Sequence, residues 1–293
     1  MIFEQKSILT IIAMQVINTI AELQRILLSV RAKDKTIGLV PTMGALHEGH
    51  ASLVRRCVSE NDITVVSIFL NPTQFNDPKD LERYPRTLES DCSILEECGA
   101  QIAFAPCVNE MYPEPDTRQF SYPPTDSVME GAYRPGHFNG VCQIVSKLFM
   151  ITNPDRAYFG EKDYQQIAVI RRMVADLNLH VNIIPCPVIR EADGLAMSSR
   201  NALLSPEEKE IANNIYRILR KSKDLGLNVQ KTKEWVISSI NDISGLETEY
   251  YNIVDGCTLA DIENWSDSVS VVGCITVYCG KTPIRLIDHI RYK

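Results

Sequence analysis

Up to about residue 190, short apolar runs alternate with segments of amphipathic spacing. Residues 63–70 are almost continuously apolar, which is typical of a strand buried on both faces of a parallel sheet. Apolar residues three or four positions apart predict helices in the intervening segments. The pattern predicts strands at 37–40, 63–70, 102–105, 156–159 and 181–188, and helices at 20–30, 50–60, 91–98, 140–152 and 165–177. This order predicts an α/β fold, with a Rossmann-like parallel sheet and helices on both faces.

The pattern changes after about residue 190. Ser205-Pro206 predicts the start of a helix, because proline is favoured at the first helical position. Helices are predicted at 206–225 and 231–243, followed by strand-like runs at 249–254, 268–278 and 284–290. We therefore expect two domains, a Rossmann-like domain at 1–189 and a small α+β C-terminal domain at 190–293.

Two long connections interrupt the first domain. Residues 71–89 and 106–136 are rich in proline and show no regular apolar spacing. Loops of this length within a compact domain are usually functional or disordered. We expect both connections to cover a substrate.

The segment Pro41–His50 joins a predicted strand to a predicted helix. Unpaired backbone N–H groups at a helix N-terminus carry partial positive charge and bind phosphate. His47 and His50 are one helical turn apart, so both can face the same ligand. Gly44 and Gly49 allow a ligand to approach the backbone closely. The segment therefore predicts a phosphate site, although a histidine pair taken alone is more often an ordinary polar surface.

Charge and cysteine content disfavour several classes of protein. The formal net charge is −7 and no basic stretch stands out, so a nucleic-acid-binding surface is not expected. The nine cysteines form no C-x-x-C pair, which is typical of reduced thiols in the cytoplasm rather than of a disulfide framework or a zinc site. The apolar run at 8–17 is too short to span a membrane and no cleavage site follows it, so we expect no membrane association.

Two further segments extend the predicted phosphate site. Gly160-Glu161-Lys162-Asp163 follows a predicted strand, and Met197-Ser198-Ser199-Arg200-Asn201 follows the predicted domain boundary. Together with Pro41–His50, they resemble the two signatures of the nucleotidyl-transferring superfamily that includes class I aminoacyl-tRNA synthetases, the HIGH motif and the KMSKS loop. More narrowly, six segments resemble the pantothenate synthetase (pantoate–β-alanine ligase) family in that family's order: 41–50, 69–75, 84–88, 134–138, 158–166 and 190–204.

The resemblance implies an enzyme that uses ATP to condense (R)-pantoate with β-alanine, giving pantothenate. The family's reaction runs through a pantoyl-adenylate intermediate and releases AMP and pyrophosphate, and its ATP is accompanied by Mg²⁺. The resemblance also implies that the first domain binds ATP and pantoate, and that the second carries a mobile Met197–Arg200 loop. Residues 1–13 then form an extension, and the enzyme is a cytoplasmic homodimer.

The resemblance also assigns roles to individual residues. His50 is a proton donor, and the groups that stabilise phosphate are His47, Lys162, Ser198, Ser199 and Arg200. Further ATP contacts are implied at Met43, Gly44, Ala45, Leu46, Glu48, Gly49, Gly160, Glu161, Asp163, Ile189 and Met197. Pantoate or β-alanine is bound by Asn71, Gln74 and Gln166, since a side-chain amide both donates and accepts hydrogen bonds. Asp91 is the nominated Mg²⁺ ligand, and Arg134 either reaches a phosphate or carboxylate or anchors its loop.

Two other functions are compatible with the same scaffold. A different HIGH-motif nucleotidylyltransferase would make a stable dinucleotide, but residues 71–74 would then have no role. A non-catalytic nucleotide-binding relative would be favoured by loss of the histidines or of Lys162, and all are present. A class I synthetase is disfavoured by the length of 293 residues and the acidic charge.

Overall fold

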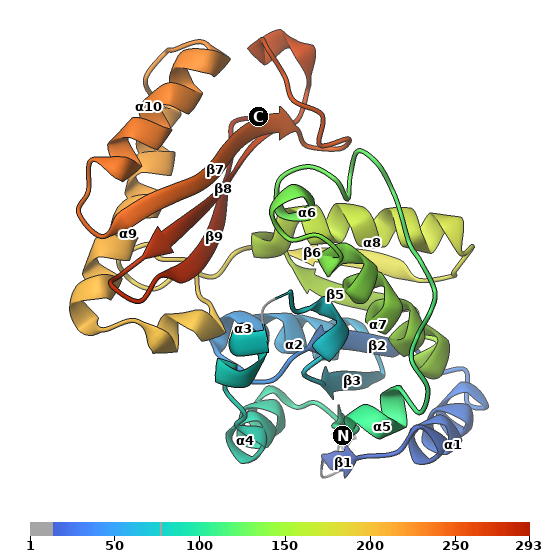
Figure 1. The fold of residues 1–293 in the computed structure, drawn as a ribbon. Coiled ribbons are helices and arrows are strands. Elements are labelled where there is room, and N and C mark those ends of the chain that lie inside the picture. Colours follow the sequence, from blue (N-terminus) through green and yellow to red (C-terminus); the bar gives the residue numbers. More distant parts are fainter. Residues whose placement is uncertain (1–13, 77) are drawn as a thin grey trace, which may run out of the picture.

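The computed structural model describes residues 14–76 and 78–293, and it contains two β-sheets. Residues 1–13, the predicted extension, lie outside the described residues. Figure 1 shows the larger sheet and its helices beside the smaller sheet, which is built from the C-terminal part of the chain. The predicted α/β fold with a small α+β C-terminal region is therefore confirmed.

The larger sheet has six parallel strands in the order β1-β4-β3-β2-β5-β6. The strands are β1 Gln15–Ile17, β2 Ile37–Thr42, β3 Ile63–Ile68, β4 Ile102–Phe104, β5 Arg156–Gly160 and β6 Asn182–Cys186. The chain runs outward from β2 through β3 to β4 on one side, and through β5 to β6 on the other. The strand order therefore reverses between β2 and β5. Ligands of such sheets bind at the carboxyl ends of the strands at this reversal.

Helices cover both faces of this sheet. They are α1 Ile20–Arg31, α2 Glu48–Glu60, α4 Leu88–Cys98, α7 His137–Thr152 and α8 Tyr164–Asp176. Leu39 and Val65 pack with residues of α1, α7 and α8 on one face. Their neighbours Val40 and Val66 pack with residues of α2 and α4 on the other face. Successive strand residues point to opposite faces of the sheet, and both faces are buried. This explains the continuous apolar runs in the sequence.

The two long connections contain short helices that the sequence analysis did not predict. These are η1 Pro72–Gln74, α3 Pro78–Arg83, α5 Val108–Met111 and α6 Glu130–Tyr133. Each is too short to show helical periodicity, so no apolar pattern marks it. The helix predicted at 140–152 also begins earlier, at His137, directly after Gly136 in a left-handed conformation with φ of 82°.

The smaller sheet is antiparallel, in the order β7-β8-β9. Its strands are β7 Leu246–Asp255, β8 Val271–Cys279 and β9 Ile284–Arg291, and its helices are α9 Pro206–Ser222 and α10 Val229–Asn241. One face packs against α9 and α10, as Figure 1 shows, and the other meets Met129 from the N-terminal part of the chain. Ser205 and Glu208 form a capping box at the start of α9. In the part of the chain described, no helix is long and apolar enough to cross a membrane.

Candidate active site

His47 and His50 lie at the start of α2, at the reversal point of the larger sheet. His47 is the N-cap of α2, and its Nδ1 accepts a hydrogen bond from the Gly49 amide at 3.1 Å. Because Nδ1 is an acceptor, the proton of the neutral ring is on Nε2, which is free to donate. The two rings lie 4.1 Å apart, centroid to centroid. Both histidines line one cavity, as their spacing predicted.

The turn before these histidines has an unusual backbone conformation. Gly44 and Ala45 both have positive φ, at 83° and 50°. Only glycine adopts this conformation without cost, so Ala45 needs support from its surroundings. Asp91 of α4 supplies it, since its carboxylate accepts from the Ala45 amide at 3.0 Å and the Leu46 amide at 2.8 Å. Thr87 donates its hydroxyl to the same carboxylate at 3.1 Å.

These contacts give Asp91 a structural role at the histidine turn, and its role as a Mg²⁺ ligand stays a prediction. Its side chain is 1% exposed and does not line the cavity. Among the described residues, no group of three or more His, Cys, Asp or Glu side chains could hold a metal ion. A buried carboxylate that accepts backbone N–H groups has the same residue type as a metal ligand, so sequence alone does not separate the two roles.

Asp91→Ala should lower the free energy of unfolding by roughly 2–4 kcal/mol, because it leaves two backbone N–H groups buried without an acceptor. Asp91→Asn keeps one acceptor oxygen and should lose less. Urea denaturation of both variants measures the effect. An unchanged unfolding midpoint combined with a raised Mg²⁺ requirement would instead support Asp91 as a metal ligand.

Lys162 lies in η2, Glu161–Asp163, which directly follows β5. Its side chain lines the cavity, and no hydrogen bond or ion pair within the described residues engages Nζ. Glu161 points elsewhere, since its carboxylate pairs with Arg291 of β9 at 2.7 Å. Asp163 and Gly160 line the cavity beside Lys162. The site therefore holds a lysine that no ion pair within the described residues engages, with the Asp163 carboxylate beside it on the cavity wall.

Both histidines are neutral at pH 7. Burial, together with the positive charge of Lys162, lowers the pKa of His47 to about 4. Burial and the neighbouring His47 lower the pKa of His50 to about 3. His50 Nδ1 is buried and has no hydrogen-bond partner among the described residues. The pair therefore presents hydrogen-bond donors and acceptors, rather than positive charge, to a ligand.

The free energy of unfolding should fall as the pH is lowered from 7 to 5. His50 in the unfolded chain binds a proton near pH 6.5, whereas the folded chain resists protonation until about pH 3, so acid favours unfolding. His50 alone should account for about 2 kcal/mol of this loss. Urea titrations at both pH values test this, and His50→Gln should reduce the difference. The exposed His180→Gln is the matched control, and equal pH dependence in all three proteins would contradict the assignment.

The loop Met197–Arg200 closes the site from the C-terminal side. The Ser199 hydroxyl donates to the Ala45 carbonyl at 2.9 Å, which joins the loop to the histidine turn. Arg200 pairs with Asp80 of α3 at 2.8 Å, so its guanidinium is already compensated by a carboxylate. The loop leads into the short 3-10 helix η3, Ser199–Leu203. A second such helix, η4 Trp265–Asp267, lies outside the site, between β7 and β8.

The opposite wall is formed by η1 and α7. Asn71 donates to the Gln74 side-chain oxygen at 3.0 Å and to the Gly140 carbonyl at 3.1 Å. A Cβ at Gly140 would lie 2.3 Å from the Thr73 carbonyl oxygen and 2.7 Å from the Gln74 Cα. Only glycine allows this approach, so η1 is packed backbone to backbone against α7.

A cavity of about 200 Å³ collects most of the predicted residues. The predicted residues that line it are Met43, His47, Gly49, His50, Asn71, Gln74, Gly160, Lys162, Asp163, Gln166, Ile189, Met197, Ser198, Ser199 and Arg200. Five other predicted ATP contacts do not line the cavity: Gly44, Ala45, Leu46, Glu48 and Glu161. Leu46 packs in the core, and Glu48 pairs with Arg55 on the surface.

Several lining residues were not predicted. Tyr84 lies against Phe75, edge to face with centroids 6.0 Å apart, and lines the cavity. Val141, Ile144 and Leu148 of α7 supply an apolar wall. The signal for α7 was the predominance of apolar residues along the predicted helix at 140–152, which is typical of a helix buried over most of its surface.

Comparisons with known proteins agree over nearly the whole chain. A family model described as pantoate-beta-alanine ligase matches residues 15–291. The pantothenate synthetase of Bacteroides thetaiotaomicron is 61% identical over 282 residues, covering 96% of this chain and 99% of that protein. The pantothenate synthetase of Thermotoga petrophila is 47% identical over 280 residues, covering 94% and 99%.

Two solved structures share the fold. The pantothenate synthetase of Thermus thermophilus superposes with a TM-score of 0.88 at 41% identity, covering 95% of this chain and 99% of that one. The pantoate-beta-alanine ligase of Francisella tularensis, complexed with beta-gamma ATP and beta-alanine, gives a TM-score of 0.81 at 37% identity, covering 96% and 98%.

Proposed function

This chain belongs to the pantoate–β-alanine ligase family and is an ATP-dependent enzyme that condenses (R)-pantoate with β-alanine; we propose that the cavity between β2 and β5 is its active site. The observation that carries this proposal is the convergence on one cavity of two neutral histidines and of Lys162, which no ion pair in the described part of the chain engages. The histidine motif, the Lys162 segment and the Met197–Arg200 loop all contribute residues to the wall of this cavity.

The reaction divides into two steps. A carboxylate oxygen of pantoate attacks the α-phosphorus of ATP, and the bond to pyrophosphate breaks, which leaves pantoyl-adenylate. The amine of β-alanine then attacks the acyl carbon, a C–N bond forms, a proton leaves and AMP is released. Neither step needs a covalent enzyme nucleophile, so positioning and stabilisation of phosphate charge account for catalysis.

His47, His50 and Lys162 act on the developing phosphate charge. Lys162 supplies a point charge, and the histidines donate hydrogen bonds from neutral rings beside the N-terminus of α2. Ser198, Ser199 and Arg200 approach the phosphates from the facing loop. Arg200 exchanges Asp80 for phosphate when ATP binds.

Pantoate lies toward η1 and ATP toward β5. Gln74 and Gln166 bind the hydroxyl and carboxylate groups of pantoate, with Asn71 holding the Gln74 side chain. Gly160 and Asp163 contact the ribose. Ile189 and Met197 line the cavity next to each other, joined by the hydrogen bond from the Met197 amide to the Ile189 carbonyl at 3.0 Å, and in this proposal they contact adenine.

Mg²⁺ arrives with ATP in this scheme. The described part of the chain offers no cluster of three acidic, histidine or cysteine ligands, and Mg²⁺ bound to nucleotide usually keeps several waters and few protein ligands. In this proposal the substrate is MgATP, and Lys162 and Arg200 would balance phosphate charge that the ion leaves exposed.

Product analysis tests the function directly. With pantoate and MgATP alone, the enzyme should release about one equivalent of pyrophosphate per active site, since adenylation does not need the amine. Adding β-alanine should start turnover and give AMP and pantothenate. A stable dinucleotide product would indicate another nucleotidylyltransferase, and nucleotide binding without any product would indicate a non-catalytic relative. Pyrophosphate release only after β-alanine is added would contradict the two-step scheme.

The remaining proposals concern organisation and location. Residues 1–189 and 190–293 act as two domains, and the Met197–Arg200 loop moves with the second. Two copies associate as a homodimer, so light scattering should give twice the 33.0 kDa mass of one chain. The enzyme works in the cytoplasm, in keeping with nine free cysteines, and cell fractionation tests this.

A further inference from the structure

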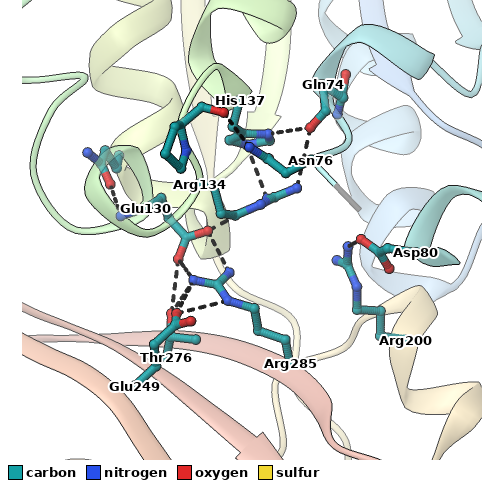
Figure 2. Close-up of polar contacts among 12 residues, drawn as sticks. Gln74, Asn76, Asp80, Glu130, Arg134, His137, Arg200, Glu249, Thr276 and Arg285 are labelled. Carbon is teal, nitrogen blue, oxygen red and sulfur yellow. Dashed lines mark hydrogen bonds and ion pairs between the residues drawn. The ribbon is translucent and has the colours of Figure 1, made fainter. Parts of the chain in front are cut away.

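Glu130 of α6 lies where the smaller sheet meets the N-terminal part of the chain. Side chains from all three strands of that sheet donate hydrogen bonds to its carboxylate: Tyr250 at 2.7 Å, Thr276 at 3.0 Å, and Arg285 through two nitrogens at 2.7 Å each. Figure 2 shows Arg285 and Thr276 converging on Glu130. The residue is 8% exposed, so its hydrogen bonds are shielded from water.

Glu130 is ionised in this setting. Burial alone would raise its pKa, but the hydrogen bonds and charge of Arg285 outweigh burial and lower the pKa to about 2. Arg285 also pairs with Glu249, to which Arg285 Nε donates at 2.9 Å. Two carboxylates therefore face one guanidinium, and the cluster has room for a second positive charge.

Arg134 supplies that second charge, one helical turn after Glu130. Its Nη1 lies 3.7 Å from the Glu130 carboxylate and 3.3 Å from His137 Nε2. His137 Nδ1 lies 2.9 Å from the backbone carbonyl of Gln74, which can only accept a hydrogen bond. The proton of His137 is therefore on Nδ1, and Nε2 accepts from Arg134. Arg134 Nη2 also donates to the Gln74 carbonyl, at 3.4 Å.

This chain of contacts ends on Gln74, which lines the cavity and is the proposed pantoate contact. Figure 2 shows Arg134 and His137 both directed at the Gln74 carbonyl, and Asn76 directed back at the segment that carries Arg134. The Asn76 side chain donates to the Pro135 carbonyl. The end of η1 is thus held by the segment between α6 and α7, which is itself held by the smaller sheet.

We propose that Glu130 and Arg134 are positioning residues for pantoate, through which Arg285 of the smaller sheet fixes the place of Gln74. The inference rests on the proposed function, because it takes Gln74 as a pantoate contact. It assigns the smaller sheet a task in placing a substrate contact. Neither Glu130 nor Arg134 touches substrate in this scheme; both act through His137 and the Gln74 backbone.

A direct role for Arg134 is the competing explanation. Arg134 lines a smaller cavity of about 60 Å³, together with Lys162, Asp163 and Arg200. If its guanidinium bound a phosphate or the carboxylate of β-alanine, its removal would act on the Michaelis constant of ATP or β-alanine. If it positions Gln74, its removal acts on pantoate. The substrate whose Michaelis constant rises therefore separates the two roles.

The experiment compares Arg134→Gln and Glu130→Gln with the unsubstituted enzyme in steady-state pantothenate synthesis. Each variant should raise the KM for pantoate about tenfold, the equivalent of one charge-assisted hydrogen bond, and leave the KM for ATP and for β-alanine within about twofold. The double variant should be no worse than the more affected single variant, because both changes interrupt one path. Arg134→Lys keeps the charge and should recover part of the loss.

Glu249→Gln is the matched control. Glu249 binds the same guanidinium as Glu130, but within the described residues it makes no contact with Arg134. Its substitution should therefore leave the KM for pantoate within about twofold. A larger rise in the KM for ATP or β-alanine, or equal rises for all substrates with a lowered melting temperature, would overturn the proposal. If Glu130→Gln does not fold, Arg134→Gln decides alone, since it leaves the Glu130–Arg285 pair intact. An unsubstituted enzyme that makes no pantothenate would refute the proposed function instead.

Discussion

Lys162→Ala should slow pantoyl-adenylate formation by about 10²–10³, the usual loss when a preorganised group facing developing phosphate charge is removed. Lys162 lines the cavity and has no ion-pair partner within the described residues, whereas Arg200 is paired with Asp80. The charge on the departing pyrophosphate grows in the adenylation step and is absent from the amide-forming step. The variant should therefore be slow with pantoate and ATP.

The half-reactions separate this role from a structural one. Given chemically made pantoyl-adenylate, Lys162→Ala should recover a much larger share of the β-alanine coupling rate than of the adenylation rate. Rapid-quench measurement of pyrophosphate release gives the first rate, and pantothenate formation gives the second. Lys223→Ala, an exposed lysine after α9, is the matched control. Equal defects in the two steps, with a lowered melting temperature, would contradict the assignment.

His50→Ala should also slow adenylation by about 10²–10³. Its ring is neutral well below pH 7, because burial and His47 lower its pKa to about 3, so in the free enzyme it acts as a hydrogen-bonding group rather than as a stored proton. A side-chain amide supplies an N–H donor of similar reach. His50→Gln should therefore recover about tenfold of the lost rate.

The comparison of the two His50 variants distinguishes hydrogen bonding from proton transfer. A proton donor at this position cannot be replaced by an amide, so equal rates for His50→Ala and His50→Gln would favour the proton-donor role implied by family resemblance. The rates should be measured on pyrophosphate release, with melting curves for both variants. Coupling of synthetic pantoyl-adenylate should be affected less in each variant.

The sequence predicts the larger sheet because its strands are buried on both faces, which makes their apolar runs visible. The edge strand β1 was missed, since Gln15 and Val16 are exposed and leave only Ile17 in the core. The short helices α3, α5 and α6 were missed for lack of any period. The predicted start of α7 was three residues late, because the left-handed conformation of Gly136 sets the first turn of the helix.

The candidate site was predicted where it is local in sequence. The histidine turn, the Lys162 segment and the Met197–Arg200 loop each carry their own motif. The structural role of Asp91 was missed because its partners are backbone amides, which leave no mark on the sequence. The Glu130–Arg285 pair was invisible for another reason: its members are 155 positions apart, and only the folded chain brings them together.

The contact between Gly140 and η1 has a consequence for how the enzyme exchanges its ligands. One side of the cavity is fixed by hard atomic contact, because even a methyl group at position 140 would lie 2.3 Å from the Thr73 carbonyl oxygen. The other side is fastened by one hydrogen bond of Ser199 and one ion pair of Arg200, which can be exchanged without a change in core packing. The cavity therefore has one wall held rigidly by backbone packing and one wall held only by polar side-chain contacts. We expect ATP to enter and AMP to leave past the Met197–Arg200 side, while the pantoate side keeps its shape through every turnover.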